Sequence, residues 1–138
     1  DEVRQQLDLS WAVAKFEQAL SWDAENRTAL QRIAQISLSR GEYSLALDLM
    51  HKAWDSGRRD EITLLLFGDS LVAQGKPESA AVIVSGLPWA AGRLNTQAWY
   101  RYFRQADYER AAYAWQAVLL LDPNNAQALN GLKANPQP

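Results

Sequence analysis

A short pattern of small and apolar residues recurs along this chain at a nearly fixed interval. Three copies begin at Ala12, Ala46 and Ala80, which lie 34 residues apart, and a fourth begins at Ala111 after 31 residues. In each copy an apolar residue follows four positions later, and a further apolar residue three positions after that. A period of this length is typical of an array built from one small structural unit.

The apolar residues within these intervals have the spacing of a helix. From Leu30 the apolar and small residues continue at Ile33, Ala34 and Ser37, which are steps of three, four and seven residues. The two-residue alternation expected for a half-buried strand does not occur. The sequence therefore predicts helices near residues 9–22, 27–39, 43–56, 61–74, 77–86, 91–105, 108–121 and 126–133.

Residues with special backbone roles mark the ends of these helices. Gly41 and Gly75 follow two of them, and glycine tolerates the left-handed backbone that commonly ends a helix. Pro77 suits the first turn of the next helix, and Asp107 suits an N-cap position. Each repeat is therefore predicted to be a pair of antiparallel helices joined by a tight turn.

Small residues are expected where the two helices of a pair cross. Ala46 and Ala80 would lie there, faced by Ala34 and Gly68, because small side chains let helix axes approach closely. The second helix of one repeat should end early, because Pro88 cannot continue it. The interval from Ala80 to Ala111 is 31 residues instead of 34, and the difference is about one helical turn. Trp99 and Tyr102 in the following helix are therefore still expected to face the core.

Two segments resemble the tetratricopeptide repeat (TPR), a 34-residue helix–turn–helix unit. Residues 107–125 resemble its closing half, and residues 41–47 resemble its turn and the start of its second helix. The resemblance implies an all-α, right-handed α-solenoid of stacked antiparallel helix pairs, forming a single domain over 1–138 within a longer protein. The implied repeats are 1–26 (partial), 27–60, 61–91, 92–125 and 126–138 (partial), which makes about three complete repeats.

The same resemblance implies a place for a partner, because the first helix of each TPR pair lines a concave groove. Leu65 and Leu66 stand where members that clamp the carboxylate of chaperone peptides carry polar groups, which argues against that activity. An apolar, amide-rich groove suits an amphipathic helix, a Pro-rich strand or another segment of the same protein. The implied groove residues are Gln31, Gln35, Leu38, Ile62, Leu65, Asp69, Val72, Thr96, Tyr100 and Phe103.

The composition argues against several other functions. Cysteine is absent, and His51 is the one histidine, with Asp48 and Asp55 near it on the same predicted helix but no nucleophile motif beside it. The 14 basic and 16 acidic residues leave a net charge of -2, which does not favour nucleic acid. No apolar run reaches the ~20 residues that cross a bilayer. We therefore expect no enzyme, cofactor, metal, nucleic-acid partner or membrane insertion.

Aromatic and basic residues leave two further interpretations open. The chain has six tryptophans, of which one or two are expected to mark a partner surface while the rest pack in the core. Arginine beside exposed aromatic rings can also hold an anion. The candidate arginines are Arg93, Arg101, Arg104 and Arg110.

Two classes of function are consistent with these observations. The first is a non-catalytic scaffold that binds a peptide or helix of a protein partner in its groove. The second is a structural or oligomerisation spacer of a larger bacterial envelope or polysaccharide-assembly protein, in which the chain itself forms homo-oligomers. Nothing in the sequence distinguishes a cytoplasmic from an extracytoplasmic location.

Overall fold

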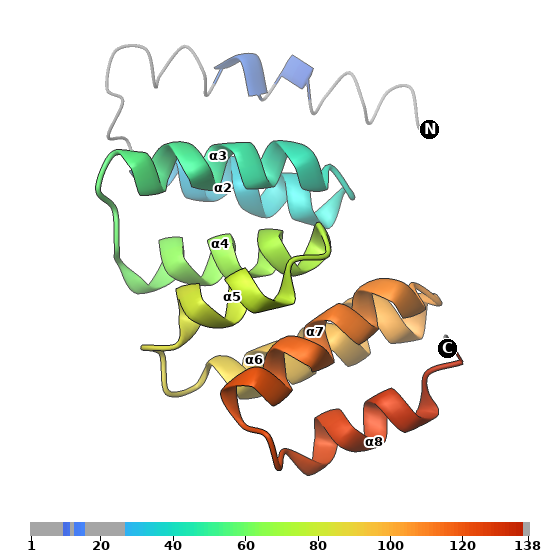
Figure 1. The fold of residues 1–138 in the computed structure, drawn as a ribbon. Helices are drawn as coiled ribbons and strands as arrows, with labels where there is room; N and C mark the ends of the chain where they lie inside the picture. Colours follow the sequence, from blue (N-terminus) through green and yellow to red (C-terminus); the bar gives the residue numbers. More distant parts are fainter. Residues whose placement is uncertain (1–9, 12, 16–26, 137–138) are drawn as a thin grey trace. The chain divides into compact units, whose positions relative to one another are not determined.

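The computed structural model describes residues 10–11, 13–15 and 27–136, which form helices joined by short turns, with no strand among them (Figure 1). The predicted all-α class is therefore confirmed for this part of the chain. The predicted helix near 9–22 lies largely outside the described residues. The chain divides into two compact units, Asp1–Leu66 and Phe67–Pro138, and the boundary falls inside helix α4 (Glu61–Ala73).

In the first compact unit, α2 (Arg27–Ser39) and α3 (Tyr43–Asp55) lie side by side (Figure 1). Their bounds agree with the helices predicted from apolar spacing. Ala34 and Ala46 are both fully buried, as their small size suggested. Large side chains around them complete the core of this pair, among them Ile33, Leu49 and Met50.

The second compact unit is built around one helix, α7 (Tyr108–Leu121), which contacts most of the other elements of the unit. Its buried face is rich in alanine, which allows close approach, and Trp115 is the large residue on that face. The other elements are the end of α4, α5 (Pro77–Val84), α6 (Ala90–Thr96), a π-helix η1 (Gln97–Tyr102), a 3-10 turn η2 (Phe103–Gln105) and α8 (Ala126–Ala134).

Three of the turns between helices have the same backbone structure. Gly41 and Gly75 have φ angles of 77° and 75°, and Ala106 takes the same left-handed conformation with φ 62°. In each turn the residue after the left-handed one donates its N–H to a carbonyl five residues earlier, which satisfies the end of the helix. These pairs are Glu42 to Ser37 at 2.8 Å, Lys76 to Leu71 at 2.9 Å and Asp107 to Tyr102 at 2.9 Å.

The starts of the following helices also agree with the sequence. Pro77 lies in the first turn of α5, and the Asp107 carboxylate accepts the backbone N–H of Arg110 at 3.3 Å as the N-cap of α7. α5 spans 8 residues, against 13 in α3, so the early end predicted from Pro88 is confirmed. None of the helices in the described part of the chain is both long and apolar enough to cross a membrane.

One prediction for the second compact unit is wrong. Tyr102 is buried as expected, but Trp99 is 42% exposed, and its neighbour Ala98 is fully buried instead. Both residues lie in η1, whose wider turns accommodate an extra residue relative to an α-helix. Ala98 consequently faces the interior, and the tryptophan turns away from it.

Candidate binding pocket

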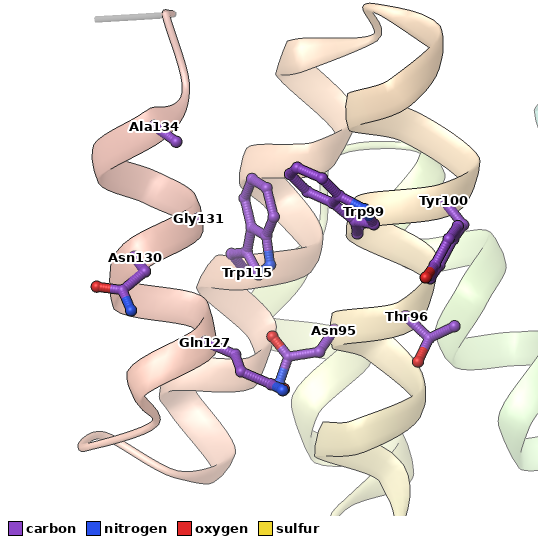
Figure 2. A pocket seen from close by; sticks show the side chains of 9 residues that line it. All are labelled: Asn95, Thr96, Trp99, Tyr100, Trp115, Gln127, Asn130, Gly131 and Ala134. Carbon is purple, nitrogen blue, oxygen red and sulfur yellow. The ribbon is translucent and has the colours of Figure 1, made fainter.

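A pocket of about 480 Å³ opens between α6 with η1 on one side and α8 on the other, all within the second compact unit (Figure 2). Trp115 reaches it from α7 between these two walls. The lining residues are Asn95, Thr96, Trp99, Tyr100, Trp115, Gln127, Asn130, Gly131 and Ala134.

The π-helix supplies the aromatic side of this pocket. Trp99 and Tyr100 are 42% and 58% exposed, and these two residue types are enriched at interfaces. Phe103 stacks on Trp99 with ring centroids 4.9 Å apart and lies 5.7 Å from the Trp115 ring. These aromatic contacts hold the Trp99 ring in place at the pocket wall.

The opposite wall depends on a glycine. Gly131 of α8 lies directly against the Trp115 indole, and a Cβ at this position would overlap the ring carbons. The indole is buried, and the centroid of the Phe103 ring lies 5.7 Å from its own, so the indole has little room to move. Gly131 therefore allows α8 to pack against α7 while the pocket remains open beside it.

Asn95 is the most buried polar residue of the lining. Its Nδ2 donates to Oδ1 of Asn125 at 3.1 Å, and the same oxygen accepts the backbone N–H of Ala128 at 3.0 Å as the N-cap of α8. These two bonds orient the Asn95 amide and engage its Nδ2, which leaves Oδ1 as the amide atom without a hydrogen-bond partner among the described residues. An unsatisfied buried acceptor costs about 1–3 kcal/mol.

The lining carries no formal charge, since none of its nine described residues is Asp, Glu, Lys, Arg or His. The Arg104 guanidinium, which is not part of the lining, lies 5.4 Å from the centroid of the Tyr100 ring. A cation over an aromatic face is mildly stabilising and leaves the other face of the ring available. The pocket therefore suits uncharged groups.

Two of the groove residues inferred from the TPR resemblance, Thr96 and Tyr100, line this pocket. Both are exposed, and the Thr96 hydroxyl donates to the Gly92 carbonyl at 3.1 Å. A third, Phe103, is half-buried and supports Trp99 from behind. The predicted groove residues that line the pocket therefore come from the end of α6 and from η1.

The remaining inferred residues of the second compact unit are buried. Val72 is 1% exposed, and Asp69 is 4% exposed and forms an ion pair with Arg93 at 2.8 Å. Burial raises the pKa of the Asp69 carboxyl, against the opposing charges of Arg93 and Arg101. Neither side chain lines the pocket.

In the first compact unit the inferred residues have varied surroundings. Gln31 donates to the Asp60 carboxylate at 3.0 Å, so it is engaged with the residue that caps α4. Leu38 is buried, and Leu65 is half-buried. The exposed members are Gln35 and Ile62.

Two of the four arginines weighed as an anion site have structural roles in the second compact unit. Arg93 pairs with Asp69, and Arg110 Nε donates to the Ala73 carbonyl at 2.8 Å, which satisfies the end of α4. The arginines join helices in these two cases. His51 lies exposed on α3, away from this cluster in the sequence.

The tryptophans fall into several environments. Trp11 is 65% exposed and Trp89 is 42% exposed, whereas Trp54 is half-buried with the Arg59 guanidinium 3.3 Å from its ring centroid. Trp22 lies outside the described residues. Trp99 and Trp115 are the two that line the pocket.

Sequence reasoning missed most of the pocket, including Asn95 and the α8 residues. The sequence does carry one signal: on one of two possible alignments of the repeats, Trp99 occupies the place of Ala34 and Gly68. A large residue at a position of close helix contact indicates a local change of helix geometry. The partner of Asn95, thirty residues further along, has no comparable signal.

Comparisons with known proteins do not assign the chain to a family. No family model matches it, and no curated protein matches its sequence. The features that bear on function are therefore the repeat pattern within the chain and the chemistry of the pocket. Within the described ranges, no group of three or more acidic or histidine side chains is arranged to hold a metal ion.

Proposed function

We propose that this chain is a TPR-like, right-handed α-solenoid that acts as a non-catalytic scaffold and binds a peptide or helix of a protein partner. The pocket between η1 and α8 is the observation that carries this proposal, because it contains Thr96 and Tyr100 at places inferred for a partner. Concave, largely apolar sites with a few oriented polar groups are typical of binding surfaces.

The turns support the repeat relation. Gly41, Gly75 and Ala106 share the left-handed conformation and the same hydrogen-bond pattern, and they recur after 34 and then 31 residues. Left-handed caps are common at helix ends, so the support comes from their recurrence at the repeat interval.

The lining chemistry supports binding rather than catalysis. Exposed Trp99 and Tyr100 belong to the residue types that contribute most to protein interfaces. Acid–base or nucleophilic catalysis requires a positioned titratable group, and the pocket lining holds no carboxylate, histidine or lysine. The proposal therefore includes neither substrate nor cofactor.

Selection of displayed random peptides on the immobilised chain tests the proposal. We expect recovered peptides to bind the wild type and to lose at least roughly tenfold in affinity with Tyr100→Glu, which puts a charge into an uncharged pocket. Val82→Glu is the matched control, because Val82 is 73% exposed and lies outside the lining. Equal losses with both variants, or no enriched peptide at all, would contradict the proposal.

A second candidate, an oligomerisation spacer, is favoured by a separate observation. Leu120 and Leu129 are 54% and 44% exposed on α7 and α8. Light scattering over a wide concentration range separates the candidates. A stable dimer that Leu120→Asp dissociates, with peptide binding unchanged by Tyr100→Glu, would favour the spacer.

A further inference from the structure

We propose that the pocket receives the indole side chain of a tryptophan from the partner segment, with the indole N–H donating to Asn95 Oδ1. This inference rests on the proposed scaffold function and names the chemistry that its pocket recognises. Three features of the pocket carry it: an unpartnered acceptor, aromatic walls and the absence of charge.

The acceptor is the most selective of these features. Asn95 is 7% exposed, and its side chain extends from α6 into the space between α6 and α8 (Figure 2). Its Nδ2 is engaged by Asn125, whose Oδ1 is itself fixed by capping α8. The group without a partner in the described part of the chain is therefore the buried oxygen Asn95 Oδ1, and a ligand group that satisfies it must be a donor.

The aromatic walls indicate what carries this donor. Trp99 and Tyr100 expose ring surface on one side, and Trp115 lies between the two helical walls. Aromatic pairs in offset or edge-to-face geometry are more favourable than the burial of equal apolar area alone. A ligand ring with an N–H at its edge can pack against the aromatic walls and donate a hydrogen bond to Asn95 Oδ1.

The number of polar groups distinguishes an indole from other uncharged rings. An indole has one donor and no acceptor, so a single buried acceptor satisfies it completely. A neutral sugar carries several hydroxyls and needs several partners, yet Asn95 is the one buried amide of the described lining, since Gln127 and Asn130 are exposed. A phenol brings an additional acceptor. A carboxylate or ammonium finds no counter-charge in the lining.

The test compares two probes that differ in the donor alone. N-acetyl-tryptophanamide is titrated into the full chain, followed by its benzothienyl analogue, in which sulfur replaces the N–H. Binding is read from the indole N–H resonances of Trp99 and Trp115, with that of Trp54 in the other compact unit as an internal reference. We expect the analogue to bind roughly fivefold to tenfold more weakly, the ratio for one hydrogen bond.

Asn95→Leu tests whether this preference comes from Asn95. We expect this variant to bind both probes within about twofold of each other, because the acceptor is gone. Asn124→Leu is the control, since Asn124 is exposed in the turn before α8 and does not line the pocket, and it should keep the wild-type ratio. Should Asn95→Leu fail to fold, the wild-type ratio of the two probes remains the deciding measurement.

The remaining outcomes separate this inference from the proposed function. Equal binding of both probes by the wild type, no binding of either, or a preference for methyl glucoside or N-acetyl-tyrosinamide would overturn the inference. If displayed peptides are recovered without a shared tryptophan, the scaffold function stands and the indole inference falls. If the probe binds with the expected ratio and no peptide is recovered, the pocket chemistry stands and the scaffold function falls.

Discussion

Two helical segments of the chain can be compared: α2, which precedes α3, and the segment of α6 and η1, which precedes α7. Both are followed by the same turn, but they bury different residues. Seven residues before the left-handed position, the first segment has Ala34, which is fully buried. At the same distance the second segment has Trp99, which is 42% exposed, and Ala98 is buried in its place. The π-helix accounts for this exchange.

The difference shows that a small residue can be buried in an irregular helix while its large neighbour is exposed. Ala98 keeps the close contact that a small residue provides, while the wider turns carry Trp99 to the surface beside Tyr100. π-Helical turns recur at functional sites because they reposition side chains in this way.

The largest expected effect on stability comes from α3 and α7, the second helices of the two pairs, which have equivalent places in the predicted repeat. Met50 and Trp115 each lie four residues after a fully buried alanine. Trp115→Ala should lower the free energy of unfolding by about 3–5 kcal/mol and Met50→Ala by about 2–5 kcal/mol, through loss of buried contacts and cavity formation. Urea denaturation measures both, and a loss under about 1 kcal/mol for either would end the equivalence.

The next effect concerns the close contact between α8 and α7. Gly131→Ala places a Cβ against the Trp115 indole and should destabilise by about 1–3 kcal/mol. In a Trp115→Ala background the same change should cost much less, because the ring is gone. A double-mutant cycle measures this coupling, and additive effects would show that the contact does not limit the packing.

The shared turn permits a reciprocal experiment. Ala106→Gly should raise stability by about 1 kcal/mol, because Ala106 takes a left-handed conformation that glycine adopts without strain. Gly41→Ala should lower stability by a similar amount, since there is open space for a Cβ and backbone strain is the remaining cost. Thermal melts compare the two variants, and changes of the same sign would contradict the common geometry.

The smallest effect concerns pH and one residue of the second compact unit. Because burial raises the pKa of Asp69 above 3.8, the native state holds this proton more tightly than the unfolded chain does. The group therefore favours folding at low pH, and that contribution is lost as pH rises from about 4 through the raised pKa. Asp69→Asn should remove this component from melting temperatures measured over that range, whereas Asp48→Asn on the exposed side of α3 should preserve it.

Much of the helical structure was predictable because its causes are local. Gly41 and Gly75 end helices through their own backbone freedom, and Asp107 begins one through its own carboxylate. The apolar spacing around Ile33 and Ala34 likewise identifies a buried face from neighbouring residues alone. The groove residues were harder, because identifying a surface requires knowing what the rest of the chain covers: Leu38 and Val72 turned out to be buried, while Tyr100 is exposed.

By itself, the sequence determined that the described chain is helical, where its helices turn and which small residues allow two helices to meet. The tertiary structure alone decided that Trp99 faces a pocket, that Asp69 pairs with Arg93 and that Asn95 is oriented by Asn125. The physical reason is range. Caps, turns and apolar periodicity act within a few residues, whereas these contacts join positions 24 and 30 residues apart and exist only once the helices have packed.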